Sequence, residues 1–380
     1  MIFDYPTLQM IWWGLVALLL VGFALTDGYD MGAGALMPFV ARTDTERRVI
    51  LNILAPHWDG NQVWFILAGG ALFAAWPMVY AAAFSTLYVP LLLVLFALIL
   101  RPGSFEYRSK VADPRWRRTW DWLMFTSSAV PALLFGVAVG NLFLGLPFRL
   151  DESLRTTYTG NFFNLLHPFA ILTGITSLSL LAMHGGAYLQ LRSEGELRAR
   201  VVRATRILAL ITTVAFLGAG LWLSTGITGY RITSLPAGTG SINPLGKTVV
   251  AAAGAWMDNY NRAPLTILAP VMGALGSILT LMLSGWGRGV AALLSSTLSI
   301  LGVLLTAGVS LFPFIMPSSI DPDSSLVVWD ATSSLRTLSL MFWVAVIFVP
   351  IVLLYTSWAF WVMRGRTTEE HIRERSGSMY

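Results

Sequence analysis

Three aspartates lie in stretches of the sequence that are otherwise almost entirely apolar. Asp27 and Asp30 occur in FALTDGYDMGAGAL, residues 23–36, and Asp59 occurs in PHWDGNQ, residues 56–62. Residues three apart share one face of a helix, and a carboxylate near the centre of a bilayer costs about 2.5 to 3.5 kcal/mol on the insertion scale. We therefore expect Asp27 and Asp30 to face the interior of a helix bundle and not lipid.

Polar and aromatic residues accompany Asp59 in the sequence, at His57, Trp58, Asn61, Gln62 and Trp64. Asp30 and Asp59 lie equally far from the polar turn at residues 41–48, which corresponds to about 15 Å along each helix. Two antiparallel neighbouring helices would therefore hold these two carboxylates at one depth, with Asp27 one turn further out.

Two roles for these acids are compatible with the residues. Carboxylates at matched depth can take up and release protons or cations, as a pathway from the cytoplasmic side requires, and close acids can share a proton. The competing interpretation is a structural lock, in which the aspartates bond to backbone groups, to Asn61, to Gln62 or to indole N–H groups. The residues alone leave both interpretations open.

The composition is that of an integral membrane protein. Hydrophobic residues make up 56% of the chain and charged residues 12%, whereas soluble proteins average about 25% charged residues. The basic residues behind the net charge of +5 stand in short runs between apolar segments, so they indicate membrane topology and not nucleic-acid binding. With no cysteine, the chain cannot form a disulfide, a thiolate metal site or a covalently attached c-type haem.

We predict nine transmembrane helices, because a bilayer core of about 30 Å needs roughly 20 apolar residues per helix. The expected ranges are 8–40, 49–75, 78–100, 119–148, 161–190, 204–228, 263–284, 289–315 and 336–362. Most Lys and Arg residues, Arg101 among them, then fall on one side, which the positive-inside rule assigns to the cytoplasm. The N-terminus is therefore expected outside and the C-terminus in the cytoplasm, and the first helix, which lacks a cleavage site, should be retained.

Glycines accompany the acids in the first two predicted spans, at Gly28, Gly32, Gly34, Gly60, Gly69 and Gly70. Small residues let membrane helices approach closely. We therefore expect these glycines at helix contacts.

Two outer connections, residues 229–262 and 316–335, are long and rich in Gly, Ser, Pro and Asp. We expect short helices or turns in them. They can cap a site, meet a partner or serve as ordinary connections.

Four histidines are present, and none has the spacing of a metal site. Bis-histidine haem ligation needs two facing imidazoles at matched depth, and in the expected topology only His57 and His184 lie toward the same side. A hydrogen-bonded histidine inside a bundle is the more common role. We therefore expect no haem or metal bound by side chains of this chain.

The sequence resembles subunit II of the cytochrome bd quinol:oxygen oxidases. The resemblance runs in order over essentially the whole chain and includes the blocks GFALTDGYDMGAGAL, NILAPHWDGNQVWFILAGGALFAAWPMVYAAAFS, RPGSFEYRSK, YTGNFFNLLHPF, LFPFIMPSS and WDATSSLRTL. It implies an all-α polytopic protein of the bacterial cytoplasmic (inner) membrane, with two four-helix bundles and one additional helix. The corresponding segments are residues 1–150, residues 151–320, and residues 321–380 with the cytoplasmic tail.

The resemblance also implies a partner and a chemistry. In that family a related subunit I holds haems b558, b595 and d and oxidises quinol, and the complex reduces oxygen to water. Subunit II lacks haem ligands, can carry a structural quinone, and can be joined by small accessory single-helix subunits, with lipids around the complex. The position of Asp59 is thought to serve proton supply to the haem d site, Asp27 and Asp30 match the second acidic block, and Trp64 would lie near an apolar oxygen route.

A function of another class is a stand-alone transporter that couples proton movement to a solute. Such a protein would show broken helices in matching positions of two halves, whereas the best-matched acids here cluster in one half. Co-purification with a haem-bearing chain distinguishes the two functions.

Overall fold

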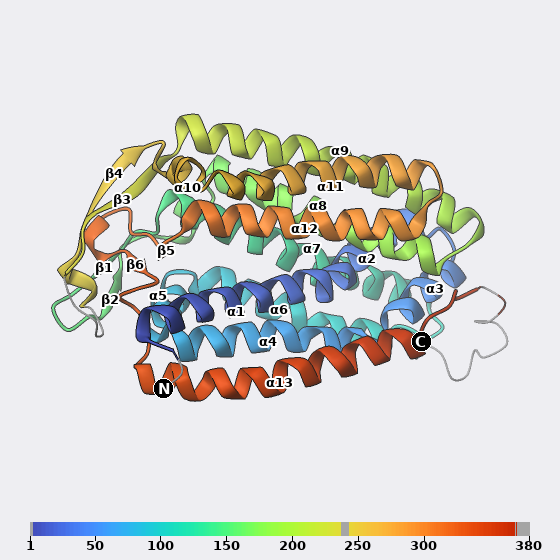
Figure 1. Ribbon diagram of the computed structural model, residues 1–380. Coiled ribbons are helices and arrows are strands. Elements are labelled where there is room, and N and C mark those ends of the chain that lie inside the picture. Colours follow the sequence, from blue (N-terminus) through green and yellow to red (C-terminus); the bar gives the residue numbers. More distant parts are fainter. Residues whose placement is uncertain (1–2, 237–242, 369, 371–380) are drawn as a thin grey trace.

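The computed structural model describes residues 3–236, 243–368 and 370, and it consists mainly of long helices that lie side by side (Figure 1). The helices are α1 Tyr5–Leu25, α2 Asp27–Val40, α3 Asp44–Leu54, α4 Trp58–Ala75, α5 Pro77–Thr86, α6 Tyr88–Glu106, α7 Pro114–Leu144, α8 Pro168–Arg192, α9 Gly195–Gly226, α10 Asp258–Arg262, α11 Leu268–Gly285, α12 Gly289–Leu311 and α13 Leu335–Val362. Single 3₁₀ turns lie at Phe162–Leu165, Pro244–Gly246, Ala255–Met257, Pro264–Ile267 and Pro322–Ser324.

The membrane spans agree with the predicted number. Within the described residues, eight segments are long and apolar enough to cross a bilayer, α1 and α2 together forming the first. The number becomes nine when α4 and α5, which are bent by 118° relative to each other, are taken as one span. The chain is therefore an all-α multi-pass membrane protein.

Two predicted spans are wrong in their limits. The range 49–75 is divided into α3 and α4, because Pro56 lacks a backbone N–H and disfavours helix in the residue before it. The range 78–100 begins in the short helix α5, and α6 continues to Glu106. This extension brings Arg101, which the sequence placed in a cytoplasmic connection, inside the bundle.

Helices α2 and α8 cross at glycines. A Cβ atom at Gly32 would lie 1.9 Å from the carbonyl oxygen of Leu181, and one at Gly185 would lie 2.3 Å from the backbone nitrogen of Ala33. The expectation of close packing is therefore confirmed for Gly32. It is wrong for Gly69 and Gly70, because a Cβ there would meet nothing within 4 Å among the described residues.

Replacing Gly32 with alanine is expected to lower the free energy of unfolding by about 1 to 3 kcal/mol, because the new methyl group meets backbone that cannot move independently. Gly69→Ala is the matched control, since it adds the same methyl group to a transmembrane helix in open space. Unfolding of the purified complex in mixed SDS and detergent micelles measures both. Equal stability of the two variants would contradict the conclusion that close packing of α2 against α8 requires a glycine at position 32.

Among the described residues, one end of the bundle carries three two-stranded antiparallel sheets, and we call it the strand end (Figure 1). The strands are β1 Phe148–Leu150 with β2 Thr156–Tyr158, β3 Thr228–Ser234 with β4 Thr248–Ala253, and β5 Phe314–Met316 with β6 Leu326–Val327. The connections at 229–262 and 316–335 were predicted to hold short helices or turns. The short helices are confirmed by α10 and by the 3₁₀ turns in both connections, but the prediction missed the strands.

A buried ion pair joins these two connections. The Lys247 Nζ lies 2.7 Å from Asp330 Oδ2, and both side chains are fully buried. Burial raises the pKa of Asp330 above its usual 3.8, against the opposing effect of the Lys247 ammonium group. Removal of either partner would leave an uncompensated buried charge, so the pair holds the two connections in one arrangement.

Polar side chains of α1 bind the segment that precedes α13 and the first turn of α13. Gln9 Nε2 donates to Thr332 Oγ1 at 2.6 Å and to the carbonyl oxygen of Trp329 at 2.9 Å. The Tyr5 hydroxyl lies 2.9 Å from the same Thr332 oxygen, and Trp12 Nε1 donates to the carbonyl oxygen of Leu338. The first helix is thereby fixed to the last connection.

The last helix lies along the outside of the bundle (Figure 1). Only 6% of the most apolar 18-residue window of α13 is buried. It packs against α1 and α4, so most of its surface is available to lipid or to another chain.

Candidate functional site

Asp27 is the first residue of α2 and forms a buried ion pair with Arg101 of α6. The two side chains are each 1% exposed. A carboxylate at a helix N-terminus is favoured by the unpaired N–H groups there, and the guanidinium group compensates the charge. The expectation that Asp27 faces the bundle interior is correct, and its partner was not foreseen.

Asp30 lies one turn further along α2 and is also buried. Asn61 Nδ2 donates to Asp30 Oδ2 at 2.7 Å and to the Tyr29 hydroxyl at 2.9 Å. The other carboxylate oxygen, Oδ1, has no hydrogen-bond partner within the described part of the chain. Asp30 is therefore held on one side by the amide and retains an acceptor on the other.

Aromatic rings from α8 and α13 lie beside the group formed by Asp30, Asn61 and Tyr29. The rings of Tyr29 and Tyr188 lie 4.2 Å apart. His57 stacks on Phe360 at 4.5 Å with an interplanar angle of 6°. Its Nε2 atom is buried and has no hydrogen-bond partner among the described residues, so His57 lines the region without holding an aspartate.

The side chain of Asp59 points away from the bundle interior, unlike those of Asp27 and Asp30. Its side chain is exposed, on the same face of α4 as the exposed Ile66 and Phe73. Asn61 contacts Asp30, and Asp59 precedes it by two residues, or about 3 Å of helix rise. Asp59 thus lies near the depth of Asp30 but points out of this chain, while Asp30 points in.

The other aromatic and polar residues of this block also have separate environments. Trp58 stacks on Phe105 with ring centroids 5.4 Å apart. Gln62 is half-buried and makes no hydrogen bond within the described residues. In the part of the chain that the structure describes, Asn61 is therefore the proposed amide partner that holds an aspartate, and Gln62 is not.

Trp64 borders an apolar pocket between α1, α4 and α13. The pocket has a volume of about 530 Å³, and Leu18, Leu353 and Phe360 also line it. The indole is buried and its Nε1 has no partner among the described residues. A Cβ atom at Gly22 would lie 2.4 Å from the ring, so this glycine of α1 makes room for the indole.

His184 has both ring nitrogens occupied. Nδ1 lies 2.8 Å from Ser296 Oγ, and Nε2 lies 3.1 Å from the carbonyl oxygen of Leu25. No group of three or more His, Cys, Asp or Glu side chains within the described residues could hold a metal ion. Neither ring nitrogen of His184 is therefore free to ligate a haem iron.

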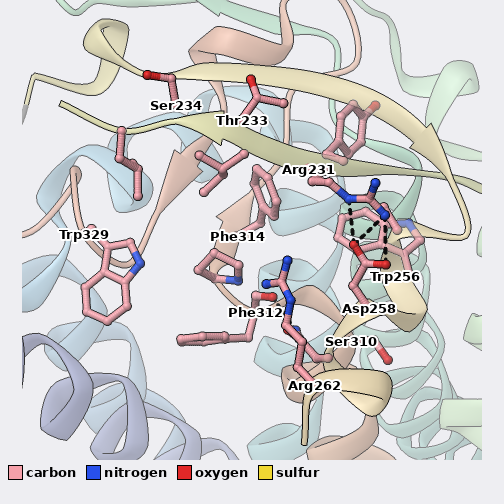
Figure 2. A pocket seen from close by; sticks show the side chains of 16 residues that line it. Arg231, Thr233, Ser234, Trp256, Asp258, Arg262, Ser310, Phe312, Phe314 and Trp329 are labelled. Atoms are coloured by element: carbon pink, nitrogen blue, oxygen red, sulfur yellow. Dashed lines mark hydrogen bonds and ion pairs between the residues drawn. The ribbon is translucent and has the colours of Figure 1, made fainter.

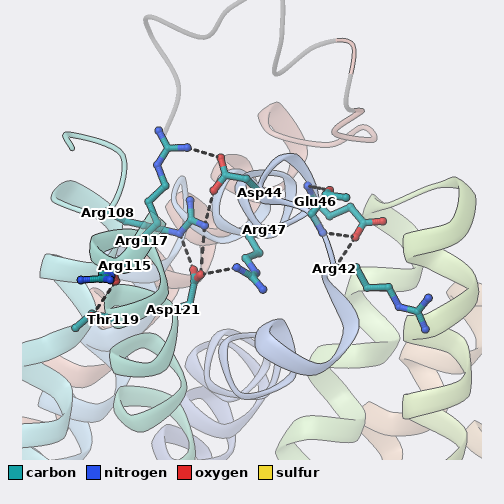
Figure 3. Close-up of polar contacts among 10 residues, drawn as sticks. Arg42, Asp44, Glu46, Arg47, Arg108, Arg115, Arg117, Thr119 and Asp121 are labelled. Carbon is teal, nitrogen blue, oxygen red and sulfur yellow. Dashed lines mark hydrogen bonds and ion pairs between the residues drawn. The ribbon is translucent and has the colours of Figure 1, made fainter. Parts of the chain in front are cut away.

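An ionic network (Figure 3) lies around α3, at the end of the bundle opposite the strands (Figure 1), which we call the charged end. Buried Arg108 donates through Nε to Asp121 Oδ1 at 2.6 Å and through Nη2 to Asp44 Oδ1 at 2.9 Å. Arg47 also reaches Asp121, and Arg117 reaches Asp44. The network ties α3 to α7 and to the residues after α6.

Glu46 also lies at the charged end, where it caps the N-terminus of α3. Burial pushes its pKa up, but hydrogen bonds from the backbone N–H groups of Arg42 and Thr43, with the Arg200 guanidinium group, outweigh this and leave the pKa below its usual 4.5. Thr43 Oγ1 accepts from Glu46 N in return, which forms a capping box. The carboxylate therefore stays ionised at neutral pH and links α3 to α9.

Sequence reasoning missed Arg101 and Arg108 as parts of buried clusters. Both follow the apolar run that ends at Leu100, and a positive-inside count treats such residues as surface charges. Asp27 in the first predicted span was a signal for such a cluster. A buried carboxylate requires a cation or several hydrogen-bond donors, and the sequence analysis assigned no cation to it.

Comparisons with known proteins give one consistent result. A family model described as cytochrome bd terminal oxidase subunit II matches residues 8–363. The chain is 51% identical to cytochrome bd-I ubiquinol oxidase subunit 2 of Escherichia coli (strain K12), over 99% of this chain and 100% of that protein. It is 30% identical to cytochrome bd ubiquinol oxidase subunit 2 of Bacillus subtilis (strain 168), over 96% of this chain and 98% of that protein.

A solved structure supports the fold. The bd oxidase of Geobacillus thermodenitrificans contains a chain that matches with a TM-score of 0.66, over 94% of this chain and 97% of that one, at 15% sequence identity.

Proposed function

Because the chain belongs to the cytochrome bd terminal oxidase subunit II family, we propose that it is the non-haem subunit of a quinol:oxygen oxidase and supplies protons to the subunit that reduces oxygen. Membership makes it part of a respiratory oxidoreductase complex in a bacterial membrane. It also implies a partner subunit I. The stand-alone transporter is not favoured, because the relatives match along their whole length.

The observation that carries the proton-supply proposal is the exposure of Asp59 on a membrane-spanning helix. Ile66 and Phe73 on the same face of α4 are suited to lipid or to an apolar partner, whereas a carboxylate facing lipid costs about 2.5 to 3.5 kcal/mol. A second protein that covers this face and offers polar groups or water to Asp59 removes that cost. We assign this role to oxidase subunit I.

The interior acids then have a supporting role in the same route. Asp30 keeps an acceptor oxygen free beside Asn61, at nearly the depth of Asp59. Asp27 is charge-compensated by Arg101, so it fixes α2 against α6. We propose that Asp59 is the group that takes up and passes on protons, with Asp30 next to it and the Asp27–Arg101 pair holding the geometry.

The orientation of the chain follows from the same proposal. The charged end carries α3 and the network around Arg108, and positive-inside statistics place such an end in the cytoplasm. Protons would then reach Asp59 from the cytoplasmic side. The N-terminus would lie outside, and the helices would divide into bundles at 1–150 and 151–320 with the final segment 321–380.

The oxidase family implies haems in the complex, and they would supply electron transfer and oxygen reduction. Both ring nitrogens of His184 are hydrogen-bonded, which argues against a haem held between His57 and His184, and we assign haems b558, b595 and d to subunit I. We propose that the apolar pocket beside Trp64 serves oxygen access. A structural quinone, accessory single-helix subunits and bound lipids remain predictions for the complex.

Affinity purification through a tag on this chain tests the function. We expect a haem-bearing second chain to co-purify, with a Soret band and quinol-dependent oxygen consumption. A matched preparation from cells that lack the partner gene should be colourless and inactive. A single colourless chain that carries out proton-coupled solute transport would contradict the proposal.

A further inference from the structure

A cavity of about 350 Å³ lies at the strand end, away from the acids of the proposed proton route (Figure 2). Its walls come from β3, from α10 and from the segment that follows α12. Aromatic side chains form much of the lining, including Trp256, Phe312, Phe314 and Trp329. A volume of this size is typical of small-ligand sites, which lie in the range of about 300 to 1,000 Å³.

Within the described part of the cavity lining, the charged groups leave one positive charge without a partner. Arg231 donates to both carboxylate oxygens of Asp258, at 2.8 and 2.9 Å, so these two residues neutralise each other. Arg262 extends into the space between Asp258 and Phe312 (Figure 2). Its guanidinium group has no hydrogen bond or ion pair within the described residues.

Two of the other polar groups are already used by the fold. The Asn259 side-chain amide donates to the carbonyl oxygens of Val309 and Phe312, at 2.8 and 2.5 Å. Ser310 Oγ lies 2.9 Å from the Tyr260 hydroxyl. Among the charged lining groups that the structure describes, the one free to bind a ligand is therefore Arg262, whose planar fork suits a phosphate or carboxylate.

The position of Arg262 relative to the membrane points to the kind of ligand. The residue ends α10 two positions before the span Pro264–Gly285. Leu265 follows with 81% exposure, and Ile267 and Leu268 with 55% each. The guanidinium group therefore lies at the level of lipid headgroups, directly beside a surface suited to acyl chains.

We propose that this cavity binds the phosphate group of an anionic phospholipid in the leaflet at the strand end. Arg262 holds the phosphate, the aromatic walls pack against the glycerol and first methylenes, and the acyl chains follow the exposed start of α11. The net charge of the lining favours an anionic headgroup over one that carries its own ammonium group. The site is separate from the acids around Asp27, Asp30 and Asp59.

The test measures binding of phosphatidylglycerol to the delipidated, haem-loaded complex by quantitative mass spectrometry of retained lipid. Arg262→Gln is expected to weaken the apparent affinity about tenfold, because it removes the charge-assisted hydrogen bonds to phosphate. Arg336→Gln is the matched control, since Arg336 is exposed, lies in the first turn of α13 and does not line the cavity. It should bind as the unaltered complex does.

Arg262→Lys provides a second variant that keeps the charge and loses the fork, and an intermediate affinity is expected. The haem absorption spectrum reports assembly of each variant. Unchanged lipid binding in both Arg262 variants would overturn the proposal. Equal competition by inorganic phosphate at the same concentration would overturn the lipid assignment, because a free anion would then suffice.

Discussion

Replacing Arg101 with glutamine is expected to lower the free energy of unfolding by about 3 to 5 kcal/mol, the usual cost of removing one partner of a buried ion pair. Asp27 would then be a buried carboxyl group without its cationic partner, since both side chains are 1% exposed in the intact protein. Unfolding of the complex in mixed SDS and detergent micelles measures the change.

Two further variants separate the lost pair from a general effect of losing an arginine. Arg118→Gln removes an exposed arginine from the start of α7 and should change stability by less than about 0.5 kcal/mol. The double variant Asp27→Asn with Arg101→Gln should recover much of the loss, since neither charge remains. A single Arg101→Gln variant as stable as Arg118→Gln would show that the pair does not hold α2 against α6.

Replacing Asp59 with asparagine is expected to lower quinol-dependent oxygen consumption about a hundredfold, the lower range for loss of a positioned proton-transfer group. Asparagine has nearly the same shape but cannot carry a proton. Because Asp59 is exposed on this chain and makes no hydrogen bond or ion pair within the described residues, the change should leave the fold of the subunit intact. An oxygen electrode measures the rate, and the haem spectrum reports assembly.

Two control variants accompany Asp59→Asn. One keeps a carboxyl group at position 59, and the other removes a negative charge at a different position. Asp59→Glu retains a titratable carboxyl and should retain most of the activity. Glu106→Gln removes an exposed carboxylate from the charged end and should be silent. If Asp59→Asn turned over at the unaltered rate, the acid would have a packing role and the proton route would have to be sought elsewhere.

The sequence was informative where a single physical constraint dominated. Carboxylates at Asp27 and Asp30 cannot face lipid, so their burial could be predicted, and so could the number of spans. The direction of Asp59 could not be, because it depends on the rotation of α4, whose surface is apolar around most of its circumference. One face of that helix meets α1 and α2, and another is free.

Partners across the fold were the least predictable feature. The end of α6 at Glu106 decides that Arg101 is buried, and the polar residues after Leu100 gave no sign that the helix continues. The strands at the opposite end depend on pairing between segments such as Phe314–Met316 and Leu326–Val327, each too short to show a period. The cavity beside Arg262 forms where β3, α10 and the segment that follows α12 meet, and the sequence does not show that these three segments are neighbours.

The bonds between α1 and the segment before α13 have a consequence for biosynthesis. Gln9 and Thr332 are 323 positions apart, so the ribosome places the first helix in the bilayer long before the partners of its Tyr5, Gln9 and Trp12 side chains exist. Unpaired polar groups are costly in hydrocarbon, and nascent α1 must keep these groups near water or beside the insertion machinery. The bonds between the first helix and its partners therefore form only as translation finishes. A nascent chain released before Thr332 would contain every interior acid but would lack the hydrogen bonds that hold α1 in place.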